Sequence, residues 1–458
     1  MTRIKIENRA GHRLGLLVAA AVLALIALTL PLGAGDPQPP SVIIISVDTL
    51  RADHMSGYGY DRLTSPNVDR LLRGGARFTQ ARTIEPLTAP ALSSMVTSLF
   101  PHEHGASRNG LRMRSGLASL PKALQAQGYR TAAFVGSWTL RDKLCGLAEH
   151  FERYENVVTR RRWLGLIRSE ATAEDVTELA TDWVEGHRQR YSDVPFMLWV
   201  HYVEPHAPYR AQRDHLDALG LKPGGNLTIA DRYDSEIAAV DHSIGNLMDG
   251  LRKLGIGDDT LIVFTSDHGE SLGEHNYWGH GRHLYEPTLR IPLGIHWKGR
   301  IEPRTIEAPA LILDLPPTIL GILGLTQPAG FRGYDWTEVL NGAEPPADRI
   351  TGYQAHKGAV ISQHDSELAR ESGLLEVAVL RSNQKEILRV GKGRRRVFDL
   401  SNDPRELNNL GAPKETPSEG LLDWMRLVRN GLESFDDELP APLDDESIEQ
   451  LRSLGYVK

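Results

Sequence analysis

Cysteine is nearly absent from this sequence: Cys145 is the only one among 458 residues. A single thiol excludes a disulfide within the chain, so we expect a hydrophobic core to supply the stability. With 41% hydrophobic residues, a chain of this length can bury such a core. The 43 glycines and 27 prolines suit many loops between short elements. These features predict a large globular protein.

The sequence also lacks an extended stretch of positive charge, and its formal net charge is -7. The basic runs at residues 160–162 and 392–396 are short. The second run lies between two candidate strands, so we expect it to form a hairpin turn. Such short runs are more often solvated loops than binding sites. We therefore predict no nucleic-acid partner.

One long apolar run is present near the N-terminus, where residues 14–32 are uncharged and follow Arg3, Lys5, Arg9 and Arg13. About twenty apolar residues span a bilayer core, and a positive flank stays cytoplasmic. Residues 1–35 are therefore expected to form a membrane anchor with the rest of the chain on the extracytoplasmic side, periplasmic or extracellular. The alternative is a cleaved signal peptide and a secreted protein, because small residues follow the run.

Apolar runs alternate with helical patterns over the first three quarters of the chain. Candidate buried strands lie at residues 41–47, 131–135, 195–200 and 261–265, and residues 230–254 have the apolar spacing of one helix face. This alternation predicts an α/β fold with a largely parallel sheet sandwiched by helices. We assign residues 36–345 to this domain.

The pattern changes in the last quarter, where short candidate strands follow one another closely at residues 376–381, 386–390 and 396–400. Closely spaced strands with polar turns predict an antiparallel sheet. A helix is expected at residues 419–432. We assign residues 346–458 to a small C-terminal α+β subdomain, which includes an acidic tail.

Four side chains that can bind a divalent cation lie near predicted strand or helix ends: Asp48, Thr88, Asp267 and His268. Asp48 and Asp267 each follow a candidate parallel strand, and ligands of open α/β sheets gather at the carboxyl ends of such strands. Carboxylates, an imidazole and a hydroxyl suit a divalent cation, and a metal can activate a hydroxyl as a nucleophile. The alternative for Thr88 is that it only caps the helix that follows.

Several segments resemble motifs of the sulfatase family: SVDTLRADH at 46–54, TSPNVDRL at 64–71, PHEHG at 101–105 and PHAPY at 205–209. Further matches are GHGRHLYE at 279–286, RIPL at 290–293 and FDLSNDPRELNNL at 398–410. The resemblance covers roughly residues 41–410. It implies the alkaline phosphatase-like α/β fold and a metal-held nucleophile that attacks sulfur or phosphorus in an ester.

The sequence departs from the sulfatase pattern at the nucleophile. The family has a Cys or Ser there, oxidised to formylglycine, in a Cys/Ser-x-Pro-x-Arg signature, whereas this chain has Thr88 and, in place of the arginine, Leu92. Oxidation of a threonine would give a ketone and not an aldehyde. The departures extend to the metal set, where Thr49 and His268 replace an Asp and an Asn. An Asp-His pair and a threonine nucleophile resemble the phosphoester-cleaving branch of the superfamily.

The resemblance assigns roles to individual residues. Asp48, Thr88, Asp267 and His268 are expected to bind one divalent metal ion, Mn²⁺, Zn²⁺, Ca²⁺ or Mg²⁺. His206 and His280 are assigned to the substrate oxyanions and the leaving group, and Arg51 is a further substrate-binding candidate. In the alternative interpretation His206 only fixes its loop, and His280 belongs to a second metal site or a polar surface together with His275 and His283.

We therefore predict a metal-dependent hydrolase, or a transferase, of phosphate or sulfate esters, with Thr88 as the nucleophile and a phosphoester as the preferred substrate. Two alternatives stay open: a sulfatase that acts without formylglycine, and a catalytically inactive protein of this fold that binds an anionic glycan or a lipid headgroup. The expected partners are an anionic ester substrate, which includes a glycan or lipid headgroup, and a membrane through the N-terminal helix.

Overall fold

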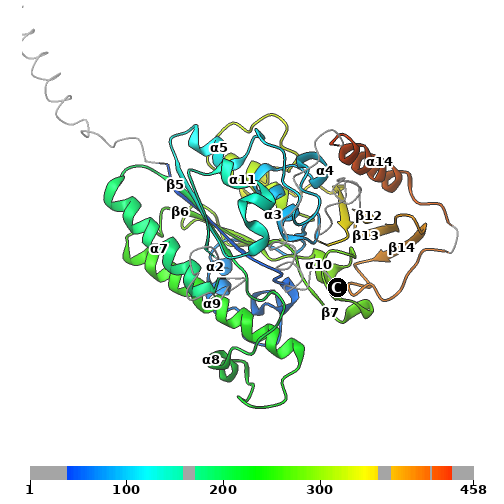
Figure 1. The fold of residues 1–458 in the computed structure, drawn as a ribbon, viewed down its shortest axis with the longest axis horizontal. Coiled ribbons are helices and arrows are strands. Elements are labelled where there is room, and N and C mark those ends of the chain that lie inside the picture. Colours follow the sequence, from blue (N-terminus) through cyan, green and yellow to red (C-terminus); the bar gives the residue numbers. More distant parts are fainter. Residues whose placement is uncertain (1–38, 158–170, 359–372, 413–414, 436–458) are drawn as a thin grey trace, which may run out of the picture. The chain divides into compact units, whose positions relative to one another are not determined.

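A mixed eight-stranded sheet forms the centre of the structure, with helices on both of its faces (Figure 1). The structure is a computed structural model and describes residues 39–157, 171–358, 373–412 and 415–435. Within these ranges, no helix combines the length and apolar character needed to cross a membrane. The predicted N-terminal anchor or signal peptide at residues 1–35 lies outside the described residues.

The strands of the main sheet lie in the order β10-β2-β9-β6-β1-β5-β3-β4. Neighbouring strands pair in parallel except β9, which is antiparallel to both β2 and β6. The strand bounds are β1 Ser41–Val47, β2 Ala76–Phe78, β3 Arg130–Val135, β4 Arg153–Asn156, β5 Phe196–Tyr202, β6 Thr260–Ser266, β9 Leu293–His296 and β10 Arg304–Ile306. The prediction of a largely parallel sheet is confirmed.

The central strands are apolar on both faces because helices cover each side. In β1, Val42 and Ile44 belong to one apolar core, and Ile43, Ile45 and Val47 belong to the other. Such two-sided burial is typical of parallel sheets. Figure 1 shows α7 and α9 on one face, with α3, α5 and α11 on the other.

The longer helices of this part are α2 Pro66–Arg73, α3 Thr88–Thr97, α5 Leu120–Gln125, α7 Ala173–Arg190, α9 Ile229–Lys253 and α11 Leu315–Ile322. Shorter helices are α4 Pro101–His104, α6 Asp142–Cys145, α8 Arg213–Leu216, α10 Glu286–Leu289 and α12 Thr337–Leu340. The helix predicted at residues 230–254 is α9, whose bounds differ from the prediction by one residue at each end.

The register of the central strands brings the carboxyl ends of three strands together. β1 lies between β5 and β6 and runs parallel to both. Ser46 pairs with His201 of β5, and Val47 pairs with Ser266 of β6. The residues that follow β1 and β6 are therefore neighbours at one edge of the sheet, as Asp48 and Asp267 were predicted to be.

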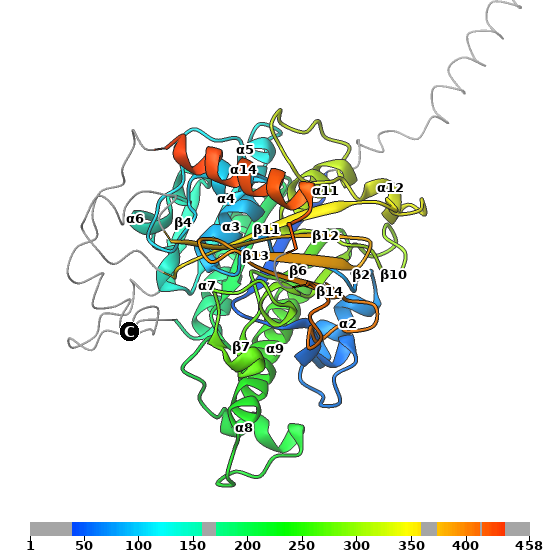
Figure 2. The ribbon, with the colours of Figure 1, turned by 90° about the vertical axis from the view of Figure 1, so that its right-hand side faces the viewer.

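A second sheet of four antiparallel strands follows, with the bounds β11 Ile350–His356, β12 Leu374–Arg381, β13 Gln384–Arg389 and β14 Arg394–Asp399. This confirms the predicted C-terminal antiparallel sheet. One of its faces contributes to the core on one side of the main sheet. The other packs on α14 Glu419–Glu433, which Figure 2 shows lying across strands β11 to β13. The predicted domain boundary at residue 345 stays a prediction.

Candidate metal centre

Two carboxylates and an imidazole meet at the carboxyl edge of the main sheet. Asp48 follows β1, and Asp267 and His268 follow β6. One ligand atom from each of these three side chains lies within 4.8 Å of the others. All three residues are buried, and at most 1% of the surface of each is exposed. The group has the size and the chemistry to hold one divalent cation.

The two oxygens of Asp267 have different surroundings. Oδ1 accepts the backbone N–H of Thr49 at 3.0 Å and that of His268 at 2.7 Å. Oδ2 is buried and accepts no hydrogen bond from the described residues. Burial raises the pKa of Asp267, and His201 and the two amides oppose this shift. A buried carboxylate oxygen without a donor is costly, so a cation at this position fits the residues present.

His268 is oriented as metal-binding histidines usually are. Its Nδ1 donates to the carbonyl oxygen of Gly269 at 2.9 Å, so Nε2 carries the lone pair. Nε2 lies 3.3 Å from Asp267 Oδ2 and 3.4 Å from the hydroxyl oxygen of Thr88. Burial, with the nearby His280, lowers the pKa of His268 well below its usual value. The neutral ring thus offers a ligand atom toward the centre.

Thr88 is the first residue of α3, and the residue at the cap position is Leu87. The interpretation of Thr88 as the helix cap is therefore wrong. The helix begins at Thr88, and Pro90 falls in its first turn, where proline is tolerated because the amides lack intrahelical partners. The hydroxyl is fully buried beside His268. The structure thus brings the four predicted metal-binding residues together.

Two further imidazoles adjoin this centre, and their environments differ. The His280 ring lies 4.5 Å from that of His268 and 5.3 Å from that of His206, measured between centroids. Burial and the nearby His280 lower the pKa of His206, whose Nδ1 donates to Ala207 O at 2.7 Å. For His280, burial is outweighed by Glu270, and the pKa is raised. Adjacent groups with opposite shifts suit an acid and a base.

Arg51 contacts protein acceptors with each of its guanidinium nitrogens. It pairs with Asp53 at 2.8 Å and with Glu274 at 2.7 Å, and it donates to the carbonyl oxygen of Glu270 at 3.0 Å. These contacts join the loop after β1 to the segment after β6. They account for the burial of Arg51, whose role in substrate binding stays a prediction.

Three residues near the centre had no predicted role. His201, inside β5, has Nε2 at 3.7 Å from Asp48 Oδ2 and Nδ1 at 2.9 Å from Ser46 Oγ. Glu270 accepts from His280 Nδ1 at 2.9 Å. Asn109 accepts the N–H of Ala89 in the first turn of α3 at 3.0 Å, and its buried Nδ2 has no acceptor among the described residues.

His275 and His283 contact residues other than the three neighbouring imidazoles of His206, His268 and His280. The His275 ring stacks on that of Tyr285 at 3.7 Å, and His283 Nδ1 lies 3.0 Å from Glu376 Oε1. The predicted alternative of a second metal site formed with His280 therefore has no support in these contacts.

The family model described as Sulfatase matches residues 40–325. Among curated proteins, the chain is 25% identical over 426 residues to the ulvan-active sulfatase of Formosa agariphila, which covers 85% of this chain and 80% of the relative. The protein BT4656, solved in complex with its substrate D-glucosamine-2-N,6-O-disulfate, has a TM-score of 0.68 at 22% identity, covering 88% of this chain and 99% of that one. The phosphonate monoester hydrolase of Silicibacter pomeroyi has a TM-score of 0.63 at 20% identity, covering 88% and 96%.

Proposed function

From a chain that belongs to the sulfatase family of the alkaline phosphatase superfamily, and so to the hydrolases of sulfuric and phosphoric esters, we infer a metal-dependent esterase with Thr88 as its nucleophile and a phosphoester as its preferred substrate. The observation that carries this proposal is the Thr88 hydroxyl, buried 3.4 Å from His268 Nε2, the imidazole that forms one group with the carboxylates of Asp48 and Asp267.

The proposed cofactor is a divalent cation held by Asp48, Thr88, Asp267 and His268. When bound, it would favour the deprotonated Thr88 hydroxyl and offset the negative charge of the ester group. The two buried carboxylates supply the negative charge that such a cation needs, and His268 is held in the required tautomer by Gly269.

The side chains support a two-step reaction. In the first step the Thr88 oxygen, whose proton has passed to solvent, bonds to the phosphorus or sulfur, the bond to the alcohol oxygen breaks, and His280 protonates that oxygen as it leaves. Glu270 favours the protonated form of His280 by raising its pKa, and it holds the ring through Nδ1. In the second step His206, whose pKa is lowered, takes a proton from the water that cleaves the Thr88 ester.

The preference for a phosphoester rests on what the nucleophile segment lacks. A threonine cannot form the formylglycine hydrate from which a sulfo-enzyme collapses by elimination, so its ester must be cleaved by attack of water. The arginine of the family signature is replaced by Leu92, which is fully buried in the core and contributes no charge to the site. The chain thus lacks both the formylglycine and the signature arginine that a sulfatase uses.

The proposal includes the location inferred from the sequence. An apolar segment at residues 14–32 behind a positive flank supports a catalytic part on the outer side of a membrane, anchored by that segment.

Assays of the purified protein with Mn²⁺, Zn²⁺, Mg²⁺ or Ca²⁺ test this function. We expect kcat/KM for aryl phosphate mono- or diesters to exceed that for aryl sulfates by about tenfold or more, a barrier difference of about 1.4 kcal/mol. Preferential turnover of the sulfates would instead identify a sulfatase that acts without formylglycine. Metal binding without turnover of any ester would favour the inactive, ligand-binding alternative.

Replacing Glu270 with glutamine tests how His280 is positioned. The variant Glu270→Gln should lower kcat/KM by about 10- to 100-fold, because a neutral amide holds the His280 ring more weakly and removes the charge that raises its pKa. Glu274→Gln is the control, since Glu274 is on the same segment and pairs with Arg51. In the His280→Ala background, Glu270→Gln should have little further effect. If the losses in kcat/KM caused by Glu270→Gln and His280→Ala were fully additive, Glu270 would not act through His280.

A further inference from the structure

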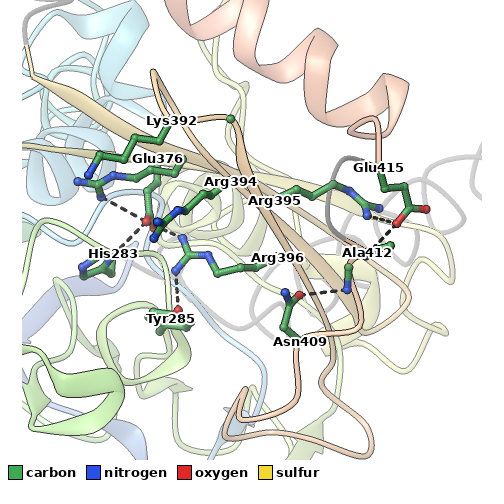
Figure 3. A pocket seen from close by; sticks show the side chains of 13 residues that line it. His283, Tyr285, Glu376, Lys392, Arg394, Arg395, Arg396, Asn409, Ala412 and Glu415 are labelled. Atoms are coloured by element: carbon green, nitrogen blue, oxygen red, sulfur yellow. Dashed lines mark hydrogen bonds and ion pairs between the residues drawn. The ribbon is translucent and has the colours of Figure 1, made fainter.

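A cavity of about 680 Å³ lies between the β13–β14 hairpin and the segment that carries His283 and Tyr285 (Figure 3). Its lining includes five cationic side chains, and the residues are Arg389, Lys392, Arg394, Arg395 and Arg396. All of these residues except Arg389 belong to the basic run at 392–396, which the sequence predicted to be a hairpin turn. The hairpin is confirmed, with Arg389 paired to Arg394, but the turn is residues 390–393 and residues 394–396 belong to β14.

Three of the cations are paired with carboxylates and two are in excess. Arg389 and Arg396 both contact Glu376, at 3.3 and 2.5 Å, and Arg395 contacts Glu415 at 2.6 Å and also Glu386. Lys392 and Arg394 make no ion pair with any residue in the described ranges. Three carboxylates against five cations leave a formal surplus of two positive charges at the cavity.

Glu376 and Lys385 attach this cavity to the catalytic part. Glu376 of β12 accepts from His283 Nδ1 at 3.0 Å and from the N–H of Leu284 at 3.1 Å. Lys385 of β13 is fully buried and lies 2.8 Å from Glu286. His283 follows His280 by three residues, so their Cα atoms are at most about 11 Å apart. A ligand of a few sugar units can therefore reach both places.

We propose that this cavity is an anion-binding subsite that holds a second negatively charged group of a polyanionic oligosaccharide, while the ester to be cleaved lies at Thr88. This inference rests on the proposed function and specifies its substrate class. The two surplus cations of Lys392 and Arg394 attract the charged group, and the paired arginines keep the hairpin in place.

The lining favours a sugar over a membrane lipid. Its members are polar or small except Tyr285, whose ring stacks on that of His275. Charged donors in a cavity of this volume suit one or two sugar units with anionic groups. The Tyr285 ring itself is occupied, by His275 and by the guanidinium group of Arg396, which lies 4.9 Å from the ring centroid. Trp278 of the β8 strand Trp278–Gly279, two residues before His280, is 57% exposed and offers an aromatic ring. A lipid surface would need apolar side chains at the rim of the cavity. Leu407 and Leu410 are exposed in the loop after β14, so binding to lipid vesicles is included in the test.

The test compares two double variants by calorimetry in the Thr88→Ala background, so that binding is read without turnover. Lys392→Ala with Arg394→Ala removes the surplus cations. Lys222→Ala with Arg213→Ala is the matched control, because both are exposed cations near α8. The probes are a size-defined sulfated hexasaccharide and its desulfated counterpart. We expect the first pair to weaken sulfated hexasaccharide binding by about tenfold or more and to reduce its salt dependence, and the control to change neither.

Equal affinity of the two double variants for the sulfated hexasaccharide would overturn the subsite, as would binding of the desulfated form with the same affinity. Binding of anionic phospholipid vesicles that needs Lys392 and Arg394, with no binding of the hexasaccharide, would reassign the cavity to a membrane surface. Absence of aryl ester turnover in the unsubstituted protein would contradict the proposed function, and the binding comparison would still decide the subsite.

Discussion

Replacing Thr88 with alanine is expected to reduce ester turnover by at least about a thousandfold, because the change removes the oxygen that bonds to phosphorus or sulfur. The fold should survive, since the change removes one hydroxyl and one methyl group from the start of α3. Metal affinity should fall less than turnover, because Asp48, Asp267 and His268 remain. The measurement is kcat under saturating metal, together with the thermal unfolding midpoint.

The matched control is Thr97→Ala, since Thr97 lies in the same helix, is equally buried and, among the described residues, its hydroxyl bonds only to Ser93 O, at 2.7 Å. It should lose stability but keep its turnover. Thr88→Ser should keep part of the activity, because serine offers the same oxygen. If Thr88→Ala turned over esters at a rate close to that of the unsubstituted protein, Thr88 would not be the nucleophile.

Asp267→Asn is expected to cost the protein its metal. A neutral amide cannot neutralise a buried cation, and we expect the metal dissociation constant to rise by roughly a hundredfold or more. At a metal concentration one hundred times the dissociation constant of the unsubstituted protein, bound metal should raise the free energy of unfolding of that protein by about 2.7 kcal/mol. The same concentration should raise that of Asp267→Asn by only about 0.4 kcal/mol. Unfolding in urea with and without metal measures this gain, and turnover should fall in parallel.

Asp241→Asn provides the comparison for Asp267→Asn. Asp241 is also a buried carboxylate, but it lies on α9 and accepts the backbone N–H groups of Asn67 and Val68 at 3.0 and 2.9 Å. Its substitution should lower stability equally with and without metal. If the metal still stabilised Asp267→Asn as much as the unsubstituted protein, the cation would bind elsewhere.

The sequence predicted the ligands because they follow apolar strands. Asp48 and Asp267 come directly after β1 and β6, and parallel pairing necessarily brings such ends together. His201 was missed for a related reason: it lies inside β5, where the apolar run was taken to end at Val200. Only the register, which sets His201 beside Ser46, brings it close to Asp48. Register across strands 155 residues apart leaves no local pattern.

The C-terminal sheet was predicted with one strand missing. β11 carries Gly352, Gln354 and His356 and therefore lacks a clear apolar alternation, yet these residues are buried. Gln354 and His356 are buried because both bond to Glu85, at 2.9 and 2.7 Å. The hairpin was predicted correctly as local structure, although its turn is residues 390–393 and residues 394–396 are in β14. That its cations face a cavity depends on Glu376 and His283, which are far apart in the chain.

The most direct test of the central claim is to quench a reaction in acid within one turnover and to identify the esterified peptide by mass spectrometry. The account predicts one phosphoryl or sulfuryl group on the Thr88 hydroxyl, present with metal and absent from Asp267→Asn. An unmodified Thr88 peptide during active turnover, or a group attached to another residue such as His206, would contradict it.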